Sequence, residues 1–245
     1  MRIIDKIKAD GVHISFEVFP PKTDAGFESV LKATDGIAEL NPSFISVTYG
    51  AGGGTSKNTV NIASHIKNDL KIPALAHLTC VSSTKEEVHK VIGQLQEAGI
   101  ENILALRGDI PQDGQFPLPG QYSHASELIE DIKKTGDFCI GAACYPEGHV
   151  EMEHKKDDIR YLKEKVDCGV DFITTQMFFD NDIFYNFLYR IREQGIMVPV
   201  LPGIMPITTK KQLARSCALS GTAVPQRFRA IVDYFGDDPA AMKQA

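Results

Sequence analysis

The stretch Phe44-Ile45-Ser46-Val47-Thr48-Tyr49-Gly50 decides the fold, because an apolar, β-rich run ends there abruptly in polar residues and glycine. Six other runs have the same form, and successive runs start 27 to 37 residues apart. They end at Glu17, His77, Arg107-Gly108-Asp109, Tyr145-Pro146-Glu147, Gln176 and Pro202-Gly203. Each interval holds one strand and one helix, which predicts parallel strands joined by helical crossovers. The predicted fold class is α/β, a (β/α)8 TIM barrel.

Helix signals support this alternation. Ser83 stands three residues before Glu86, the spacing of a capping box, and the apolar positions that follow share one helical face up to Gly99. Asp180 or Asn181 can cap a later helix, whose apolar run is Phe184, Phe187, Leu188 and Ile191. Parallel strands bring their C-terminal ends to one rim, and on a β/α barrel that rim carries the chemistry.

Only seven strands are evident in the sequence. After Gln212 the pattern predicts two helices and a short tail, with no further β-run. A barrel of eight strands would then lack its last one, and its first and seventh strands would have unpaired edges. We therefore expect a single domain, residues 1–245, that is incomplete at its C-terminal side. A longer natural chain or another chain would supply the missing strand.

Composition limits the classes of function. The 245 residues are 43% hydrophobic, enough for one large core. With 26 Lys and Arg against 32 Asp and Glu, the net charge is −6, which argues against a nucleic-acid partner. Neither a secretion signal nor a bilayer-spanning run is present, so we expect a cytoplasmic protein without membrane contact. The five cysteines form no CxxC pair, and no histidine has metal-ligand spacing, so no metal is predicted.

Glu17 is the first candidate for chemistry. It ends a strand between Phe16 and Val18, where desolvation would favour the protonated carboxyl. A carboxylic acid that keeps its proton near neutral pH can act as a general acid. A structural glutamate paired with a basic group is an equally open interpretation.

Two loops could contact a ligand. Arg107 can bind a phosphate or a ring carbonyl, Gly108 lets the backbone approach closely, and Asp109 can steady a cation. A solvated salt bridge in a turn is the alternative. The glycine-rich segment 51–56 could cradle an anion, although it fits no nucleotide fingerprint and is more often a tight turn.

The remaining candidates are single side chains. Gln176 ends a strand, and its amide offers donors and an acceptor to a heterocycle. Rings that lie at or just after strand ends can bind a cofactor, although lone histidines are more often structural: His77, Tyr145 and His149. A polar stripe on one helix is usually solvated surface: Asp158, Tyr161 and Lys165.

Taken together, six motifs in order closely resemble the methylenetetrahydrofolate reductases, from about residue 1 to residue 245. They are Phe16-Glu17-Val18-Phe19-Pro20-Pro21, Val47-Thr48-Tyr49-Gly50-Ala51-Gly52-Gly53, Ala105-Leu106-Arg107-Gly108-Asp109, Tyr145-Pro146-Glu147-Gly148-His149, Gln176 with Phe178-Phe179-Asp180, and Pro202-Gly203-Ile204-Met205-Pro206.

The resemblance implies a flavin-dependent barrel. NADH or NADPH would reduce bound FAD, and 5,10-methylenetetrahydrofolate would then take the hydride in a ping-pong reaction to become 5-methyltetrahydrofolate. Glu17 would protonate N10 of the folate and open the ring to an iminium, and Asp109 would stabilise that cation. The resemblance also implies a homo-oligomer, with a partner subunit as the alternative.

The family motifs carry further roles over by position. The implied FAD contacts are Thr48, Tyr49, Ala51, His77, Arg107, Gly108, Asp109, Ala125, Tyr145, His149, Asp158, Tyr161 and Lys165. The implied folate contacts are Glu17, Gln176 and Gln212.

Two other functions remain open. A barrel lyase or aldolase acting on a phosphorylated substrate would suit the glycine-rich loop and the acidic rim, but the strand ends lack a Schiff-base lysine or a metal cluster. A non-catalytic barrel subunit of a larger complex would suit the missing strand.

Overall fold

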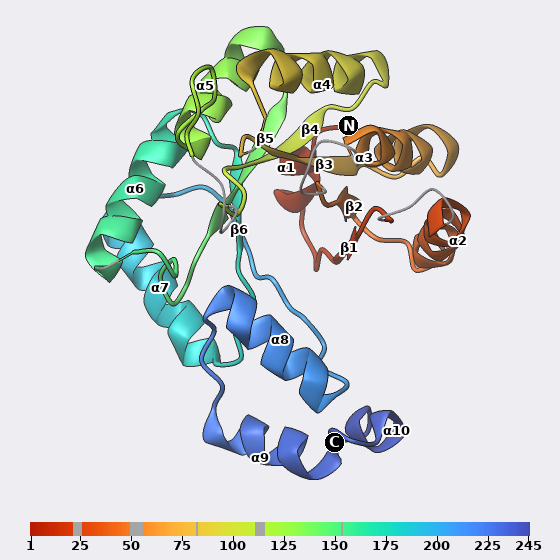
Figure 1. Cartoon of the computed structure of the whole chain (residues 1–245), viewed down its shortest axis with the longest axis vertical. Coiled ribbons are helices and arrows are strands. Elements are labelled where there is room, and N and C mark those ends of the chain that lie inside the picture. The colour runs from red at the N-terminus through yellow and green to blue at the C-terminus, as the bar shows by residue number, and fades with distance from the viewer. Residues whose placement is uncertain (22–25, 50–55, 82, 111–115, 153) are drawn as a thin grey trace. The chain divides into compact units, whose positions relative to one another are not determined.

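The computed structural model describes residues 1–21, 26–49, 56–81, 83–110, 116–152 and 154–245. Strands and helices alternate along this part of the chain (Figure 1). The strands are β1 (Ser15–Val18), β2 (Phe44–Val47), β3 (Ala74–Thr79), β4 (Asn102–Leu106), β5 (Cys139–Cys144), β6 (Phe172–Thr175) and β7 (Val200–Leu201). The helices are α1 (Ile3–Ile7), α2 (Phe27–Ala38), α3 (Ser56–Ser64), α4 (Lys85–Glu97), α5 (Ala125–Thr135), α6 (Lys155–Asp167), α7 (Asn181–Glu193), α8 (Lys210–Ser220), α9 (Gln226–Phe235) and α10 (Pro239–Met242), and a π-helical turn, His65–Asp69, follows α3.

The described strands form one parallel sheet in chain order, β1 to β7. This confirms the predicted α/β barrel class and the seven strands. Pro199 directly precedes β7, where its missing N–H breaks no ladder, and its carbonyl accepts a hydrogen bond from Ile173 N at 2.9 Å.

The chain divides into two compact units, and β5, α6 and β6 pass from one into the other. The first unit comprises 1–142 and 165–172. In it, α2 packs on β1, α3 on β2 and β3, and α5 on β4, while α3 and α4 lie side by side (Figure 1). The middle strands are buried, as expected of parallel strands between two packed faces.

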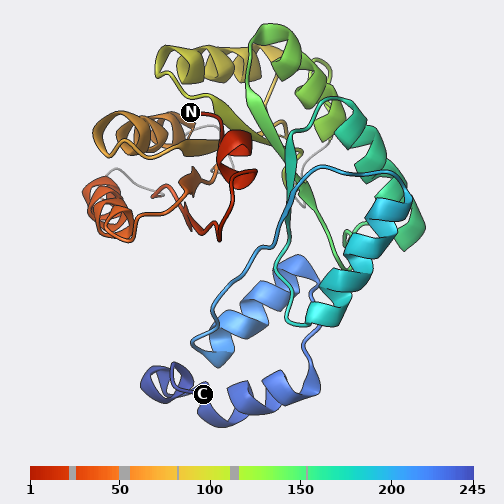
Figure 2. The same ribbon diagram turned by 180° about the vertical axis from the view of Figure 1, so that it is seen from behind.

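The short helix α1 is fixed to this unit by Asn102, the first residue of β4. Asn102 Oδ1 accepts a hydrogen bond from Ile3 N at 2.7 Å, and its Nδ2 donates to Met1 O at 3.3 Å and to Ala74 O at 3.1 Å. Ile3 is fully buried as a result, and α1 lies against the strands (Figure 2).

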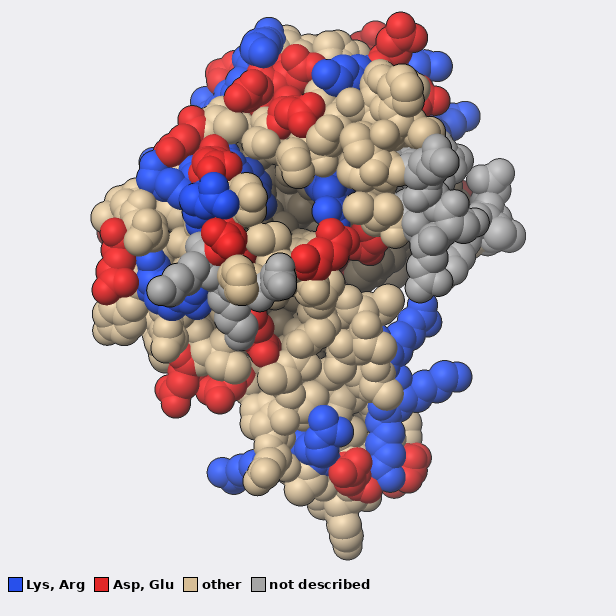
Figure 3. All heavy atoms as spheres, turned by 60° about the vertical axis from the view of Figure 1, so that its left-hand side comes forward, with Lys and Arg blue, Asp and Glu red and all other residues tan. Residues whose placement is uncertain are grey.

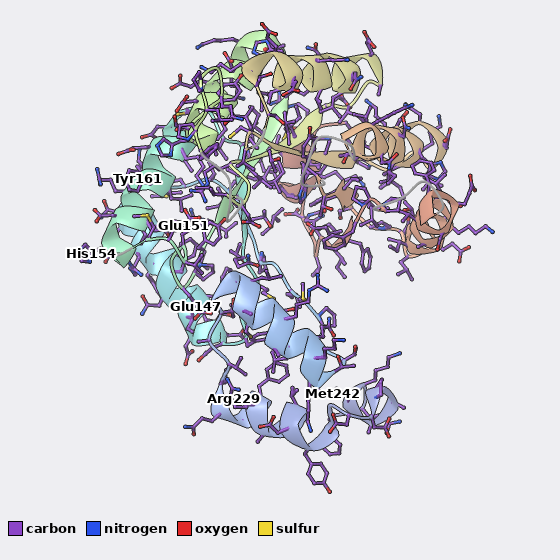
Figure 4. The ribbon with its side chains drawn as sticks, viewed as in Figure 1. Glu147, Glu151, His154, Tyr161, Arg229 and Met242 are labelled. Carbon is purple, nitrogen blue, oxygen red and sulfur yellow. The ribbon has the colours of Figure 1, made fainter. Side chains whose placement is uncertain are left out.

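The second unit comprises 143–164 and 173–245. Its C-terminal helices enclose a small apolar core of Ile207, Leu213, Val232 and Met242, the last of which is labelled on α10 in Figure 4. Thr209 caps α8, since its side chain accepts a hydrogen bond from Gln212 N at 3.1 Å. The core and the cap hold the first turn of α8, which carries Gln212.

One predicted cap is wrong by a residue. The capping box of α4 is Thr84 with Glu87, because Glu87 N donates to Thr84 Oγ1 at 3.2 Å and Thr84 N donates to Glu87 Oε2 at 2.7 Å. Ser83 is buried instead. The neighbouring pairs Ser83/Glu86 and Thr84/Glu87 have the same spacing, so the sequence signal could not separate them. For α7 the cap is Asp180.

Two surface properties complete the description. Acidic and basic side chains are interspersed over the upper part of the face drawn in Figure 3. Among the described residues, every helix is too short or too polar to cross a lipid bilayer.

Candidate active site at the strand ends

The register of the first three strands brings a carboxyl, a hydroxyl and an imidazole together. Glu17 pairs with Ser46 across β1 and β2, and Ser46 pairs with Leu75 across β2 and β3. Side chains alternate between the faces of a strand, so His77, two residues beyond Leu75, shares the face of Ser46 and Glu17. Strand pairing alone therefore places these three side chains close to one another.

These side chains converge on one oxygen of Glu17. Ser46 Oγ donates a hydrogen bond to Glu17 Oε2 at 3.3 Å, and His77 Nε2 lies 3.4 Å from the same oxygen. The latter contact misses hydrogen-bond geometry, and Nε2 has no hydrogen-bond partner among the described residues. A buried polar atom without a partner is uncommon and marks a site where a proton or a ligand can be accommodated.

Burial sets the protonation of this cluster. It raises the pKa of Glu17 above its ordinary value, against a smaller lowering by the hydrogen bond from Ser46. The Glu17 side chain is 47% exposed, more than the sequence predicts, because β1 is the first strand of the sheet. Burial also lowers the pKa of His77 to about 4, so the ring is neutral at pH 7. The site thus places a carboxyl with a raised pKa beside a neutral imidazole.

The loop after β4 has the form that Arg107-Gly108-Asp109 predicts. Gly108 has φ +89°, and a Cβ there would lie 2.5 Å from Val81 Cγ1, so only glycine fits. Arg107 Nε donates to Gly108 O at 3.2 Å, and Arg107 O accepts from Val81 N at 2.8 Å. These bonds hold the partly buried Arg107, whereas Asp109 is exposed.

Other predicted site residues of the first unit lie at or near strand ends. Thr48 follows β2, and its backbone N donates to Val18 O at 3.0 Å. Tyr49 lines a cavity of about 630 Å³ between α3 and α4, together with Lys57 and Lys90. Ala125 is the first residue of α5. Ala51 and the glycine-rich segment lie outside the described residues.

In the second unit, two predicted residues interact. The rings of Tyr145 and His149 meet edge to face, with centroids 4.6 Å apart, and His149 Nδ1 accepts a hydrogen bond from Glu151 N at 3.2 Å. The neighbouring Glu147, labelled with Glu151 in Figure 4, accepts from Ala223 N at 3.0 Å. These contacts fix the loop after β5.

The polar stripe of α6 crosses the boundary between the units. Asp158 and Tyr161 belong to the second unit and Lys165 to the first. Tyr161 is exposed, and the Arg160 guanidinium lies 4.6 Å from the centroid of its ring (Figure 4).

Both predicted glutamines are held by hydrogen bonds. Gln176 Oε1 accepts from Met177 N at 2.9 Å, which orients its amide. Gln212 Oε1 accepts from Thr208 N at 2.9 Å, and its Nε2 donates to Pro206 O at 2.9 Å. Gln212 therefore also fixes the loop before α8.

Sequence reasoning missed Ser46. The signal was a single polar residue inside the apolar strand Phe44–Val47, opposite Glu17 once the strands are paired. Among the described residues, no group of three or more His, Cys, Asp and Glu side chains could hold a metal ion.

The fold and this cluster define a β/α-barrel protein with an acid at its strand ends. The family model described as methylenetetrahydrofolate reductase matches residues 2–245, and the chain belongs to that family.

Relatives include two groups of proteins. "Methylenetetrahydrofolate reductase (NADH) 1" of Arabidopsis thaliana is 37% identical over 99% of this chain and 44% of its own length. The "5,10-methylenetetrahydrofolate reductase" of Pectobacterium carotovorum is 36% identical over 95% of this chain and 76% of its own, and that of Escherichia coli 34% over 95% and 77%. The chain thus spans less than half of the plant relatives.

Solved structures share the fold at low identity. An uncharacterised Clostridium thermocellum protein that binds two copies of 5-methyl-5,6,7,8-tetrahydrofolic acid has a TM-score of 0.66, 15% identity, and coverage of 98% of this chain and 83% of its own. A phosphonopyruvate hydrolase has a TM-score of 0.55 and 15% identity, over 100% of this chain and 88% of its own. Because these proteins differ in ligand, the likeness describes architecture and not chemistry.

Proposed function

We propose that this chain catalyses reduction of 5,10-methylenetetrahydrofolate to 5-methyltetrahydrofolate with electrons from NADH or NADPH. Family membership supports the reaction class. The single observation that carries the proposal is the Glu17 carboxyl at the end of β1, whose pKa is raised by burial next to Ser46 and His77.

Glu17 supplies the acid step. A carboxyl with a raised pKa keeps its proton to higher pH and can give it to N10 of the folate, which opens the five-membered ring to an iminium. Asp109, an exposed residue on the loop after β4, would stabilise that cation. Gln176 and Gln212 would bind the pterin with oriented amides.

The donor set fits a flavin, the cofactor typical of the family. Around the strand ends, the first unit offers the Thr48 hydroxyl, the His77 imidazole and the Arg107 guanidinium, which suit ring carbonyls and a pyrophosphate. Bound there as FAD, a flavin would relay a hydride from the nicotinamide to the folate. Further FAD contacts would come from Tyr49, Ala51, Gly108, Asp109, Ala125, Tyr145, His149, Asp158, Tyr161 and Lys165. We further propose a cytoplasmic homo-oligomer.

The test measures two half-reactions separately in the variant Glu17→Gln: reduction of the flavin by NADH and transfer of the hydride to the folate. NADH should still bleach the flavin absorbance, whereas transfer to the folate should fall by a factor of about 10² to 10⁴, as expected on losing a general acid. Glu39→Gln, which changes an exposed glutamate at the end of α2, is the control. An equal loss of both half-reactions would make Glu17 structural. A colourless protein that takes up no FAD would favour the alternative that the chain is a lyase. A flavoprotein without turnover would favour the alternative that it is a non-catalytic subunit.

A further inference from the structure

We propose that Ser46 and His77 are positioning residues that hold Oε2 of Glu17, so that the proton delivered to the substrate is carried by Oε1. The inference rests on the proposed function, because it concerns how the acid of that reaction is presented. Neither residue needs to touch the folate for this role.

The geometry distinguishes the two carboxyl oxygens. Ser46 Oγ and His77 Nε2 lie 3.3 and 3.4 Å from Oε2, one on β2 and one on β3. Ser46 Oγ also lies 3.5 Å from Phe16 O, but its contact with the carboxyl is the shorter. Two polar atoms from adjacent strands therefore face the same oxygen.

Proton accounting then assigns the acidic hydrogen. Ser46 donates a hydrogen bond to Oε2, and His77 Nε2 lies 3.4 Å from the same oxygen, outside hydrogen-bond geometry. An oxygen that accepts a hydroxyl hydrogen bond is the carbonyl-type acceptor of a neutral carboxyl, so the acidic hydrogen resides on the other oxygen.

Burial makes this arrangement rigid. Ser46 is only 6% exposed and the His77 side chain 8%, so water has little access to replace either contact. The carboxyl itself is partly exposed and would otherwise rotate about its terminal torsion, which is broad. Holding one oxygen leaves the other in a defined direction, which is how a supporting shell preorganises a catalytic group.

The kinetic test uses the holoenzyme with saturating FAD. Ser46→Ala should slow the folate half-reaction about tenfold, the rate equivalent of one lost hydrogen bond, and leave bleaching by NADH unchanged. Ser46→Thr, which keeps a hydroxyl, should recover most of the rate. The folate half-reaction of His77→Gln should be faster than that of His77→Leu, because the amide keeps a polar group beside Oε2. Thr34→Val is the control, since it removes another fully buried hydroxyl, in α2.

A spectroscopic readout is independent of turnover. In mildly acidic buffer without substrates, the infrared carbonyl band that disappears in Glu17→Gln belongs to the protonated Glu17. Ser46→Ala should move that band to higher wavenumber, because the carbonyl oxygen loses a donor. An unmoved band, or a Ser46→Ala enzyme that slows both half-reactions equally, would overturn the proposal.

The two proposals fail differently. If Glu17→Gln keeps normal folate reduction, the proposed acid role is wrong. If Glu17→Gln abolishes it while Ser46→Ala and His77→Leu do not slow it, Glu17 is the acid and only the positioning role is wrong.

Discussion

Two histidines of the first unit lie beside carboxyl groups, yet their pKa values shift in opposite directions. His77 Nε2 is 3.4 Å from Glu17 Oε2, and its pKa is lowered to about 4. His65 lies in the π-helical turn, where each ring nitrogen is 2.8 Å from a carboxylate oxygen, of Asp35 and of Asp69. The pKa of His65 is raised.

The two pKa values shift in opposite directions because burial dominates at His77, whereas hydrogen bonding and charge dominate at His65. Burial lowers the pKa of both rings, but for His65 the hydrogen bonds and charges of Asp35 and Asp69 outweigh it. His77 is more deeply buried, and burial also raises the pKa of Glu17 beside it. A nearby carboxyl therefore does not by itself charge a histidine: His77 stays neutral in a buried site, whereas His65 pairs with two largely exposed carboxylates.

The largest expected effect on the free energy of unfolding is the loss of stability in acid that His77 causes. Its pKa falls from 6.5 to about 4 on folding, so below pH 6.5 the unfolded state binds a proton that the folded state does not. The stability contribution is complete above pH 6.5 and falls by about 3 kcal/mol toward pH 4, at about 1.36 kcal/mol per unit. Urea unfolding of wild type and His77→Gln should show this slope only in wild type. Parallel curves of stability against pH for the two proteins would contradict this prediction. His154→Gln, at an exposed position, is the control.

A smaller effect of opposite sign is expected at His65. Its raised pKa means that the contribution is complete below the ordinary value of 6.5 and is lost as pH rises through the folded value. Since Asp35 and Asp69 are largely exposed, His65→Gln should cost about 1 kcal/mol or less in acid. Added salt should weaken this difference and leave that of His77 nearly intact. If the stability lost in His65→Gln grew as the pH rose, the ion-pair interpretation would be wrong.

The smallest effect is expected at Glu17. A raised pKa lowers stability as pH rises through it, so Glu17→Gln should be more stable than wild type at pH 8 and equal to it in acid. Partial exposure limits the gain to a few tenths of a kcal/mol. Thermal unfolding at both pH values measures it, with Glu39→Gln as the matched variant. A loss of stability at pH 8 would show that the ionised carboxyl is held favourably.

The fold was largely predictable because each strand and helix is encoded locally. Apolar runs ending in polar groups located all seven strands, and Gly99, which was predicted to end its helix, has positive φ. The capping box was misplaced because two overlapping pairs fit the same rule.

The site was predictable only in part. Glu17 and His77 were recognisable as polar residues that follow apolar β-runs, although β1 continues to Val18 and β3 to Thr79. Ser46 becomes significant only through the register of β1 and β2. Which atoms meet depends on strand stagger, and no local pattern encodes that. The exposure of Glu17 likewise depends on its strand being the first of the sheet.

The hydrogen bond from Ile3 N to Asn102 Oδ1 bears on how the protein is made. It joins positions that ribosomal synthesis produces about a hundred codons apart, whereas each strand pair is completed within a few tens. The first helix must therefore wait, with Ile3 and Ile4 uncovered, until the fourth strand has left the exit tunnel.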